Sequence, residues 1–264
     1  MQPDNKHILI TGGAGGIGVP LVARLTEAGA KVTVASRRAN TRTAGESVEH
    51  VELDLTRRDS IQALATRFAA NVPDILINLA GVNAFGRFEA MSDEDLEAII
   101  KVNLLAPMQL TRSLLPAMSR RGSGQIVNIG SVLGDIGMAH FVAYSASKAG
   151  LANFSEALRR EVDEQGIVVT HVSPRAVDTP MNGSEIERFN MLTDATVDSA
   201  ERVADIIFES IVNDRAHVTI GIAERFFVKV NALVPRVVDR SLKGNLKHAE
   251  SVLENAINQE AHHV

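Results

Sequence analysis

Short apolar runs alternate with longer segments of helical periodicity along most of this 264-residue chain. The runs read HILI, KVTVAS, VEHVELD, DILINLAG, QIVNIGSV, IVVTHVSP and HVTIGIA, and a helical pattern separates most of them. Strands that alternate with crossover helices form parallel sheets with helices on both faces. The sequence therefore predicts an α/β fold, a doubly wound parallel sheet in three layers. Such sheets bind ligands outside the carboxyl ends of their strands, so the residues after each run are candidate site residues.

The composition excludes several classes of protein. The net charge is −5 and charged residues make up 22% of the chain, so a basic face for nucleic acid is not expected. There is no cysteine, which excludes disulfides, thiolate metal sites and cysteine nucleophiles. The eight histidines show no ligand spacing, so no metal is expected. The sequence shows no signal peptide and no apolar run of about 20 residues, and we expect a cytoplasmic protein.

Five glycines fall within residues 10–18, ITGGAGGIG, directly after the first apolar run. Two spacings fit: G-x-G-x-x-G from Gly13, or T-G-x-x-x-G-x-G from Thr11. In either, glycine allows backbone N–H groups to approach a pyrophosphate at the N-terminus of the next helix. A tight turn without a ligand is the alternative interpretation. The residues predicted to contact the phosphates are Gly12, Ala14, Gly15, Gly16, Ile17 and Gly18.

The end of the second run indicates which dinucleotide would bind. An acidic residue at this place normally holds the adenosine ribose of NAD. This chain has Ser36 there, followed by Arg37 and Arg38. A hydroxyl and guanidinium groups favour a 2′-phosphate, so we predict NADP(H) rather than NAD. The alternative is that the two arginines are solvated loop charges.

Tyr144 and Lys148 lie four residues apart in YSASK, at the start of a predicted helix. This spacing places the phenol and the ammonium on one helical face. A nearby cation favours the phenolate, so we expect Lys148 to lower the Tyr144 pKa toward the range of an acid/base catalyst. Ser131 ends the run QIVNIGS, thirteen residues before the tyrosine.

In combination, these motifs resemble the short-chain dehydrogenase/reductase family over roughly residues 6–222. The motifs occur in order: TGGAGGIG, Asp54 in LDLT, NLAG, Asn103 in KVNLLAP, Ser131, and YSASK. The resemblance implies a Rossmann-like fold and a nicotinamide-dependent reaction between a carbonyl and an alcohol. It implies that Tyr144 is the general acid/base, that Ser131 holds the substrate oxygen, that Lys148 binds the nicotinamide ribose and lowers the tyrosine pKa, and that Asn103 holds a water.

The resemblance also implies further cofactor contacts. Asp54 and Leu55 would meet the adenine, and residues after the fourth and sixth runs would line the rest of the cofactor; these are Asn78, Ala80, Gly81, Pro174, Val177 and Thr179. Simpler interpretations exist, in which Asn103 caps a turn, Ser131 ends a strand and Asp54 caps a helix. The chain departs from the family pattern at Arg175, where a glycine is usual. Arg175 would contact a substrate anion or a cofactor phosphate, or point outward.

Apolar residues near the predicted catalytic groups indicate a hydrophobic ketone or secondary alcohol as substrate. Those expected to contact it, beside Ser131, are Leu133, Phe141 and Met181, and the loop over residues 181–196 supplies the rest of the lining. Packing into the core is the alternative for each. Arg120 and Arg121 resemble the basic positions by which 3-oxoacyl reductases of the family dock acidic acyl carriers, so a carrier-bound acyl group is an alternative substrate. Outside enzymes, the alternative is a cofactor-binding regulator or scaffold.

Residues 223–264 form a predicted C-terminal helical extension of the catalytic and dinucleotide-binding domain, residues 1–222. Apolar residues recur there at helical spacing, and six basic residues accompany them: Arg225, Lys229, Arg236, Arg240, Lys243 and Lys247. A basic amphipathic helix lies on an anionic membrane, or packs on its own domain or a second subunit. Pro235 should kink or split the segment. The family resemblance also implies a dimer or tetramer through the helices that hold Asn103 and Tyr144.

Overall fold

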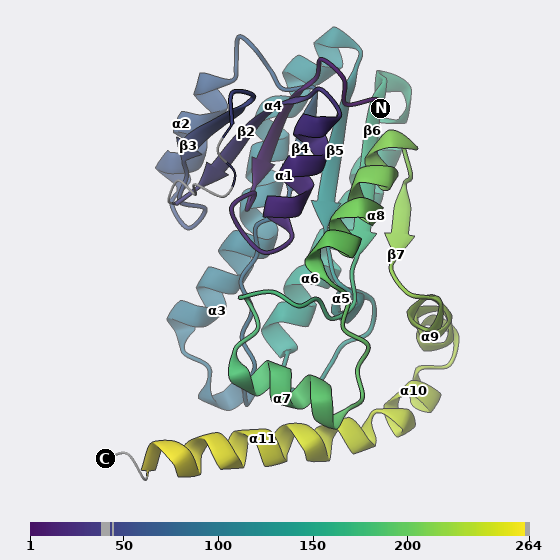
Figure 1. Cartoon of the computed structure of the whole chain (residues 1–264). Helices are drawn as coiled ribbons and strands as arrows, with labels where there is room; N and C mark the ends of the chain where they lie inside the picture. Colours follow the sequence, from purple (N-terminus) through teal and green to yellow (C-terminus); the bar gives the residue numbers. More distant parts are fainter. Residues whose placement is uncertain (38–42, 44, 262–264) are drawn as a thin grey trace.

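The computed structural model describes residues 1–37, 43 and 45–261. Its centre is a parallel sheet of seven strands in the order β3-β2-β1-β4-β5-β6-β7 (Figure 1). The strands are β1 His7–Thr11, β2 Lys31–Ser36, β3 Val48–Glu52, β4 Ile75–Asn78, β5 Gly124–Ile129, β6 Ile167–Ser173 and β7 His217–Thr219. The predicted doubly wound parallel sheet is therefore confirmed. The strand order reverses between β1 and β4, which opens a crevice at their carboxyl ends.

Helices cover both faces of the sheet, as the alternating apolar runs predict. The helices α1 (Gly18–Glu27) and α8 (Ala200–Val212) pack on one face against Ile8 and Ile10 of β1. On the other face, α2 (Arg58–Arg67), α4 (Ala106–Arg121) and α6 (Val142–Glu161) pack around Leu9. Successive residues of a strand point to opposite faces, so one uninterrupted apolar run serves both cores.

Shorter elements lie beyond the carboxyl ends of the strands. They are the 3₁₀ turn η2 (Phe88–Ala90), α3 (Asp93–Ile100), the π-helical turn η3 (Lys101–Leu105), α5 (Val132–Asp135) and α7 (Ser184–Leu192). The 3₁₀ turn η4 (Asp163–Gln165) joins α6 to β6 at the other edge of the sheet. Loops and short helices at the carboxyl edge are where such folds build their sites.

The last strand is shorter than the run HVTIGIA predicts. It ends at Thr219, and Gly221, with φ +102°, turns the chain so that α9 begins at Ile222. Three helices follow: α9 (Ile222–Leu233), α10 (Pro235–Ser241) and α11 (Lys243–Ala261). The break expected at Pro235 is confirmed, because the proline occupies the first position of α10, where its missing N–H costs no helical hydrogen bond.

The C-terminal helices pack around the carboxyl edge of the sheet. Val238 of α10 is buried against Val132 and Ile136 beside α5, and α11 runs beneath α7, where Ala249 and Val252 are buried (Figure 1). The division of the chain at residue 222 stays a prediction. Within the described residues, no helix is both long and apolar enough to cross a membrane. No group of three or more potential metal-ligating side chains occurs among them either.

Candidate active site

The turn between β1 and α1 contains positions that only glycine fits. Gly12 has φ +75°, and a Cβ there would lie 2.7 Å from the backbone that follows β4. A Cβ on Gly18 would lie 2.3 Å from the Gly12 carbonyl oxygen, and one on Gly16 would lie 2.6 Å from a side chain after β6. Added Cβ atoms on Gly13 and Gly15 would meet no atom closer than 3.0 Å. Of the two spacings, the backbone therefore requires T-G-x-x-x-G-x-G.

The N-terminus of α1 meets the cavity without a capping side chain. Ile17 is the N-cap residue and makes no side-chain hydrogen bond, and residues 14–18 line the cavity wall. The first N–H groups of a helix lack intrahelical partners, and the helix dipole makes this end positive. A close, side-chain-free backbone at such an end fits a pyrophosphate. The residues present therefore suit a dinucleotide cofactor.

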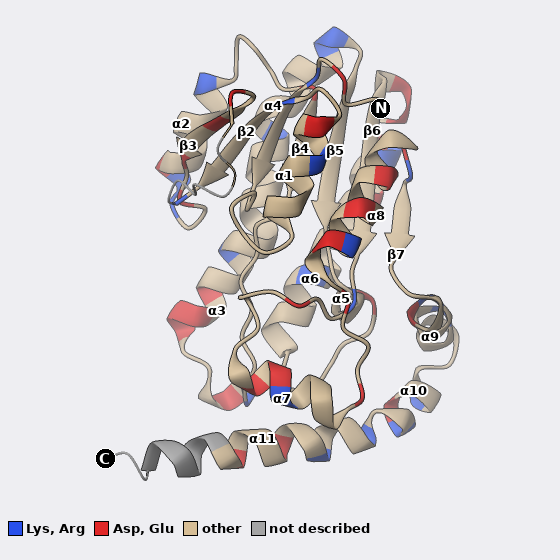
Figure 2. Cartoon of the chain, in the orientation of Figure 1, with Lys and Arg blue, Asp and Glu red and all other residues tan. Residues whose placement is uncertain are grey.

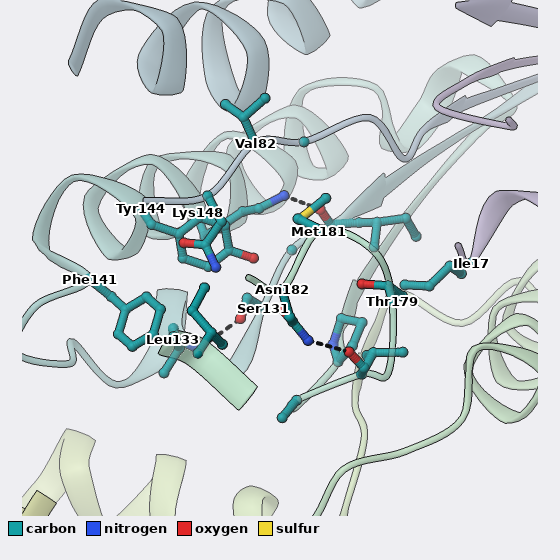
Figure 3. Close-up of a pocket in the computed structure, with 18 of the residues that line it drawn as sticks. Ile17, Val82, Ser131, Leu133, Phe141, Tyr144, Lys148, Thr179, Met181 and Asn182 are labelled. Carbon is teal, nitrogen blue, oxygen red and sulfur yellow. Dashed lines mark hydrogen bonds between the residues drawn. The ribbon is translucent and has the colours of Figure 1, made fainter. Parts of the chain in front are cut away.

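A cavity of about 1090 Å³ extends from this turn to the C-terminal helices. Figure 3 shows part of its lining. The cavity brings together most of the predicted site residues: Gly12, Ala14, Gly15, Gly16, Ile17, Gly18, Ser36, Arg37, Asp54, Leu55, Ala80, Gly81, Ser131, Leu133, Phe141, Tyr144, Lys148, Pro174, Val177, Thr179 and Met181. Arg38 lies outside the described residues. Asn78 and Asn103 do not line the cavity.

The end of the cavity beside β2 and β3 combines Ser36, Arg37 and Asp54. Asp54 accepts hydrogen bonds from the Thr56 N–H at 2.9 Å and the Thr56 hydroxyl at 2.7 Å. These two bonds, and to a smaller extent the charge of Arg37, hold the pKa of Asp54 below its ordinary value. Asp54 is not the cap of α2, because Arg57 occupies the N-cap position. The alternative interpretation of Asp54 as a helix cap was wrong.

Ser131, Tyr144 and Lys148 converge at the centre of the cavity (Figure 3). Ser131 follows β5, and its hydroxyl caps the short helix α5 by accepting the Leu133 N–H at 3.1 Å. Tyr144 and Lys148 come from the first two turns of α6, and the Lys148 Nζ lies 5.7 Å from the centre of the tyrosine ring. The Ser131 hydroxyl acts on the phenol, because it lowers the Tyr144 pKa. A serine and a tyrosine so placed can hold one substrate oxygen between them.

The protonation chemistry of the pair differs from the sequence-based expectation. Burial raises the pKa of Tyr144, and the hydrogen bond with Ser131 opposes this shift. Lys148 is only 4% exposed, and burial lowers its pKa to about 8. Its Nζ donates to the Ile129 carbonyl oxygen at 2.9 Å. The Tyr144 pKa is therefore shifted in the direction opposite to the expected one, because burial disfavours the charged phenolate.

Asn103 and Asn78 are buried below the cavity. Asn103 lies in the π-helical turn η3, and its side chain bonds both backbone groups of Val82, accepting the N–H at 2.8 Å and donating to the carbonyl at 2.9 Å. It also donates to the Ser147 hydroxyl at 3.0 Å. Asn78 donates to Asn128 across the sheet at 2.8 Å. These amides position the chain behind the cofactor wall, and the expectation that Asn78 lines the cofactor was wrong for its side chain, because β4 turns it into the core.

The substrate end of the cavity is lined by apolar side chains, as expected, and several of them also pack on one another. The ring of Phe141 lies 5.0 Å from that of Phe85 and 5.9 Å from that of Phe189, so Phe141 belongs to an aromatic cluster as well as to the wall. Met181 lies at the rim, half exposed, beside Asn182, which donates to the Val177 carbonyl at 2.7 Å. The structure thus supports both the lining and the packing interpretations of Phe141.

Sequence reasoning missed the contribution of the C-terminal helices to this wall. Side chains of α9, α10 and the start of α11 close the side of the cavity opposite α7: Glu224, Phe227, Val238, Ser241, Leu242 and Asn245. The helical spacing of their apolar members was visible in the sequence. What that spacing cannot show is which protein surface the buried stripe meets.

Arg175 lines the cavity, and two carboxylates hold its guanidinium instead of leaving it pointing outward. Its Nε and Nη2 donate to the two carboxylate oxygens of Asp198 at 2.9 and 3.0 Å. Its Nη1 lies 3.2 Å from the nearer carboxylate oxygen of Glu224, in the first turn of α9. These carboxylates, Asp198 first, raise the pKa of Arg175. Arg175 therefore ties the loop after β6 to the segment before α8 and to the C-terminal helices.

The two arginines proposed to dock an acyl carrier lie at the far edge of the sheet. Arg120 and Arg121 end α4, directly before β5 begins, whereas the cavity lies beyond the other end of that strand. Arg121 donates to the carbonyl oxygens of Val72 at 2.9 Å and Pro73 at 3.0 Å, so it holds the loop before β4. Within one chain, these residues are not neighbours of the cavity.

The comparison with known proteins agrees with this geometry. A family model described as short chain dehydrogenase matches residues 6–189. The chain belongs to the short-chain dehydrogenase/reductase family. Members of this family are oxidoreductases that interconvert carbonyls and alcohols, and this chain is one of them.

Individual members of the family resemble this chain over most of its length. The ketoacyl reductase HetN of Nostoc sp. is 32% identical over 258 residues, which are 89% of this chain and 87% of the relative. The 3-oxoacyl-[acyl-carrier-protein] reductase FabG of Escherichia coli is 31% identical, over 83% of this chain and 95% of its own. A short-chain dehydrogenase from Burkholderia cenocepacia, solved with NADP, superposes with a TM-score of 0.80 at 25% identity, covering 92% of this chain and 99% of its own.

A further solved relative concerns the cofactor. A 4-hydroxyisoleucine dehydrogenase complexed with NADH has a TM-score of 0.74 at 26% identity, and the match covers 82% of this chain and 97% of that one. Relatives of the same fold are thus described with NADP and with NADH. A nicotinamide cofactor is supported for this chain.

Proposed function

We propose that this protein is an NADP(H)-dependent oxidoreductase that reduces a hydrophobic ketone, or oxidises the matching secondary alcohol, with Tyr144 as the general acid/base. The observation that supports this most directly is the convergence of Ser131, Tyr144 and Lys148 in the cavity that begins at the glycine turn. A nicotinamide bound here would supply the hydride for the carbonyl carbon. Ser131 donates a hydrogen bond to the carbonyl oxygen, and Tyr144 transfers its proton to that oxygen.

The roles of the remaining residues follow from their positions. Lys148 follows Tyr144 by one helical turn on α6. Its ammonium lies next to Gly81, where an added Cβ would be 3.6 Å from Nζ. It would hold the nicotinamide ribose there and favour the phenolate once the site is filled. Asn103 would support a proton relay by fixing the Val82 backbone. The apolar wall excludes water, which strengthens each of these electrostatic contacts.

The preference for NADP(H) is supported by the charge at the end of β2. Ser36 and the exposed Arg37 line the cavity there, and no carboxylate ends the strand. We expect Arg37→Ala to raise the KM for NADPH about tenfold, the usual size of one lost charged contact, and to leave the KM for NADH within about twofold. Arg67→Ala, which removes an arginine at the far end of α2, is the matched control. Equal changes for the two cofactors would refute the preference.

The reaction itself is tested with a panel of ketones and secondary alcohols, followed by nicotinamide absorbance with both cofactors. Tyr144→Phe removes only the phenol oxygen, and general acid catalysis contributes about 10² to 10⁴ in rate. We therefore expect kcat to fall at least about 100-fold while NADPH binding, measured by fluorescence, is unchanged. Turnover within tenfold of wild type would refute the role of Tyr144. Tight NADPH binding without turnover of any substrate would favour a regulatory or scaffold protein.

A second candidate is a 3-oxoacyl reductase that acts on carrier-bound groups. It is supported by the ketoacyl reductases among the relatives, HetN and FabG, and by the volume of the cavity, about 1090 Å³. The two proposals are distinguished by measuring KM for the same 3-oxoacyl group on an acyl carrier and on a small thiol ester. A lower KM on the carrier than on the thiol ester would favour this candidate. Equal KM values would favour a small free ketone.

We also infer a cytoplasmic homo-oligomer. The absence of cysteine suits a reducing compartment. Half-exposed apolar side chains on η3, α4 and α6 support the assembly through these helices that the family resemblance implies, and they are Leu105, Met108 and Val142. Sedimentation velocity on the full chain, with Met108→Glu as the disruptive variant, tests whether a dimer or tetramer forms.

A further inference from the structure

The outer face of α9 and α10 is apolar and lies uncovered. Seven of the fifteen large apolar side chains that are exposed among the described residues fall between residues 222 and 246. They are Ile222, Phe226, Phe227, Leu233, Val234, Val237 and Leu246. Monomeric proteins rarely gather exposed apolar groups in one place unless the place binds something. We call residues 222–240 of this face the α9–α10 surface.

The pattern along α9 separates an inner from an outer stripe. Glu224 and Asn231 point to the body of the protein, where Asn231 donates to the Asp135 carbonyl at 3.3 Å. Ile222, Phe226 and Leu233 recur at helical spacing on the other side, and the two end residues are 80% and 81% exposed. The helix is therefore fixed on one side and offers an apolar stripe on the other.

Basic side chains accompany this stripe. Between residues 222 and 247 there are six basic and two acidic residues, although the whole chain has a net charge of −5. Figure 2 shows the basic residues along α10 and the first part of α11. Lys229 falls within the stripe itself, at position i+7 from Ile222, and a lysine can keep its ammonium at an interface while its stem lies along apolar surface. Within the described part of the chain, Lys229, Arg236 and Arg240 form no ion pair.

We propose that the α9–α10 surface docks this protein onto an anionic lipid bilayer. Apolar groups that enter the headgroup region, bordered by cations that meet acidic lipids, are the features of a helix that lies in the membrane plane. An acidic protein partner would also match the charge, but the line of exposed Ile222, Phe226 and Leu233 along one side of a helix suits entry into the headgroup region. Phe227, 45% exposed, lines the cavity as well, so the docked face adjoins the substrate site.

The proposal is tested by sedimenting the full-length protein with vesicles of phosphatidylcholine, with and without phosphatidylglycerol. We expect binding only to the anionic vesicles and its loss in high salt. Each basic residue near such a surface is worth about fivefold in partition, so Lys229→Gln with Arg236→Gln should lower partition about 30-fold. Phe226→Ser with Leu233→Ser should lower it at least about tenfold, because the apolar contact is lost. These four positions are exposed, so the variants should fold.

Matched controls alter the same residue types elsewhere. Phe88→Ser removes a half-exposed phenylalanine beside α3, and Lys31→Gln with Arg215→Gln removes two charges at the amino edge of the sheet. Both should leave partition within about twofold. Absence of wild-type binding to anionic vesicles, or an equal loss in the controls, would overturn the proposal. A shift from dimer to monomer in the Phe226→Ser variant without vesicle binding would assign the face to a second copy instead. Vesicle binding is read without turnover, so its outcome is separate from that of the proposed reaction.

Discussion

Replacing Arg175 tests whether the tie between the site loop and the C-terminal helices stabilises the fold. Arg175→Met keeps the length of the side chain and removes the guanidinium that two carboxylates share. Asp198 is 4% exposed, and its remaining cationic partner among the described residues would be Arg202. The Nε of Arg202 lies 3.4 Å away, on a side chain that is 62% exposed. Glu224 lies nearer to solvent and can rehydrate, so the cost arises mainly at Asp198.

The magnitude follows from the burial of Asp198. Removing one partner of a buried ion pair typically costs about 3 to 5 kcal/mol, because a charge is left without compensation. The remaining contact with Arg202 reduces this, and we expect the free energy of unfolding to fall by about 3 kcal/mol. At about 2 °C or more for each kcal/mol in a chain of this size, Tm should fall by about 6 °C.

Chemical denaturation and thermal unfolding measure this loss, and a second substitution shows its origin. Asp198→Asn in the Arg175→Met background removes the buried charge, so the double variant should be more stable than Arg175→Met by at least about 1 kcal/mol. Arg175→Lys should restore only part of the stability, because an ammonium cannot reproduce the two-point contact. A fall in Tm of less than about 2 °C for Arg175→Met would refute the reasoning. So would strict additivity of the Arg175 and Asp198 substitutions.

Two further predictions concern Lys148 and Gly18. The Lys148 pKa is lowered to about 8, so the unfolded chain binds more protons between about pH 8 and 10.5 and wild-type stability gains a contribution as pH rises through this window. Lys148→Met has no ammonium at this position, so its stability lacks that gain. Its free energy of unfolding in urea should exceed that of wild type by about 2 kcal/mol at pH 7, and the difference should disappear by pH 10. Unfolding free energies of the two proteins that change in parallel with pH would contradict this. Gly18→Ala places a Cβ 2.3 Å from the Gly12 carbonyl oxygen, so NADPH affinity should fall at least about tenfold. In the control Gly15→Ala the added Cβ lies 3.3 Å from the same oxygen, and the affinity for NADPH should fall much less. Equal losses, measured by NADPH fluorescence titration, would contradict the steric explanation.

The sheet could be predicted because its signal is local. Ile8, Leu9 and Ile10 form one apolar run, and such a run is enough to predict a strand that is buried on both faces. The glycine turn and the pairing of Tyr144 with Lys148 are also short-range, since a turn fixes φ and a helix fixes which residues share a face. Prediction from the local pattern fails at β7. The apolar run HVTIGIA indicates a longer strand, but the chain changes direction at Gly221 and the helix α9 begins at Ile222.

By itself, the sequence determined the doubly wound fold, the spacing of the glycine turn and the three residues that meet at the centre of the cavity. Only the tertiary structure decided that the Tyr144 pKa is raised, that Asn78 faces the core and that Arg175 binds Asp198 and Glu224. The physical reason is that desolvation and ion pairing depend on atoms brought together from distant segments. Arg175 and Glu224 are separated by 49 positions, and no periodicity in the chain connects them.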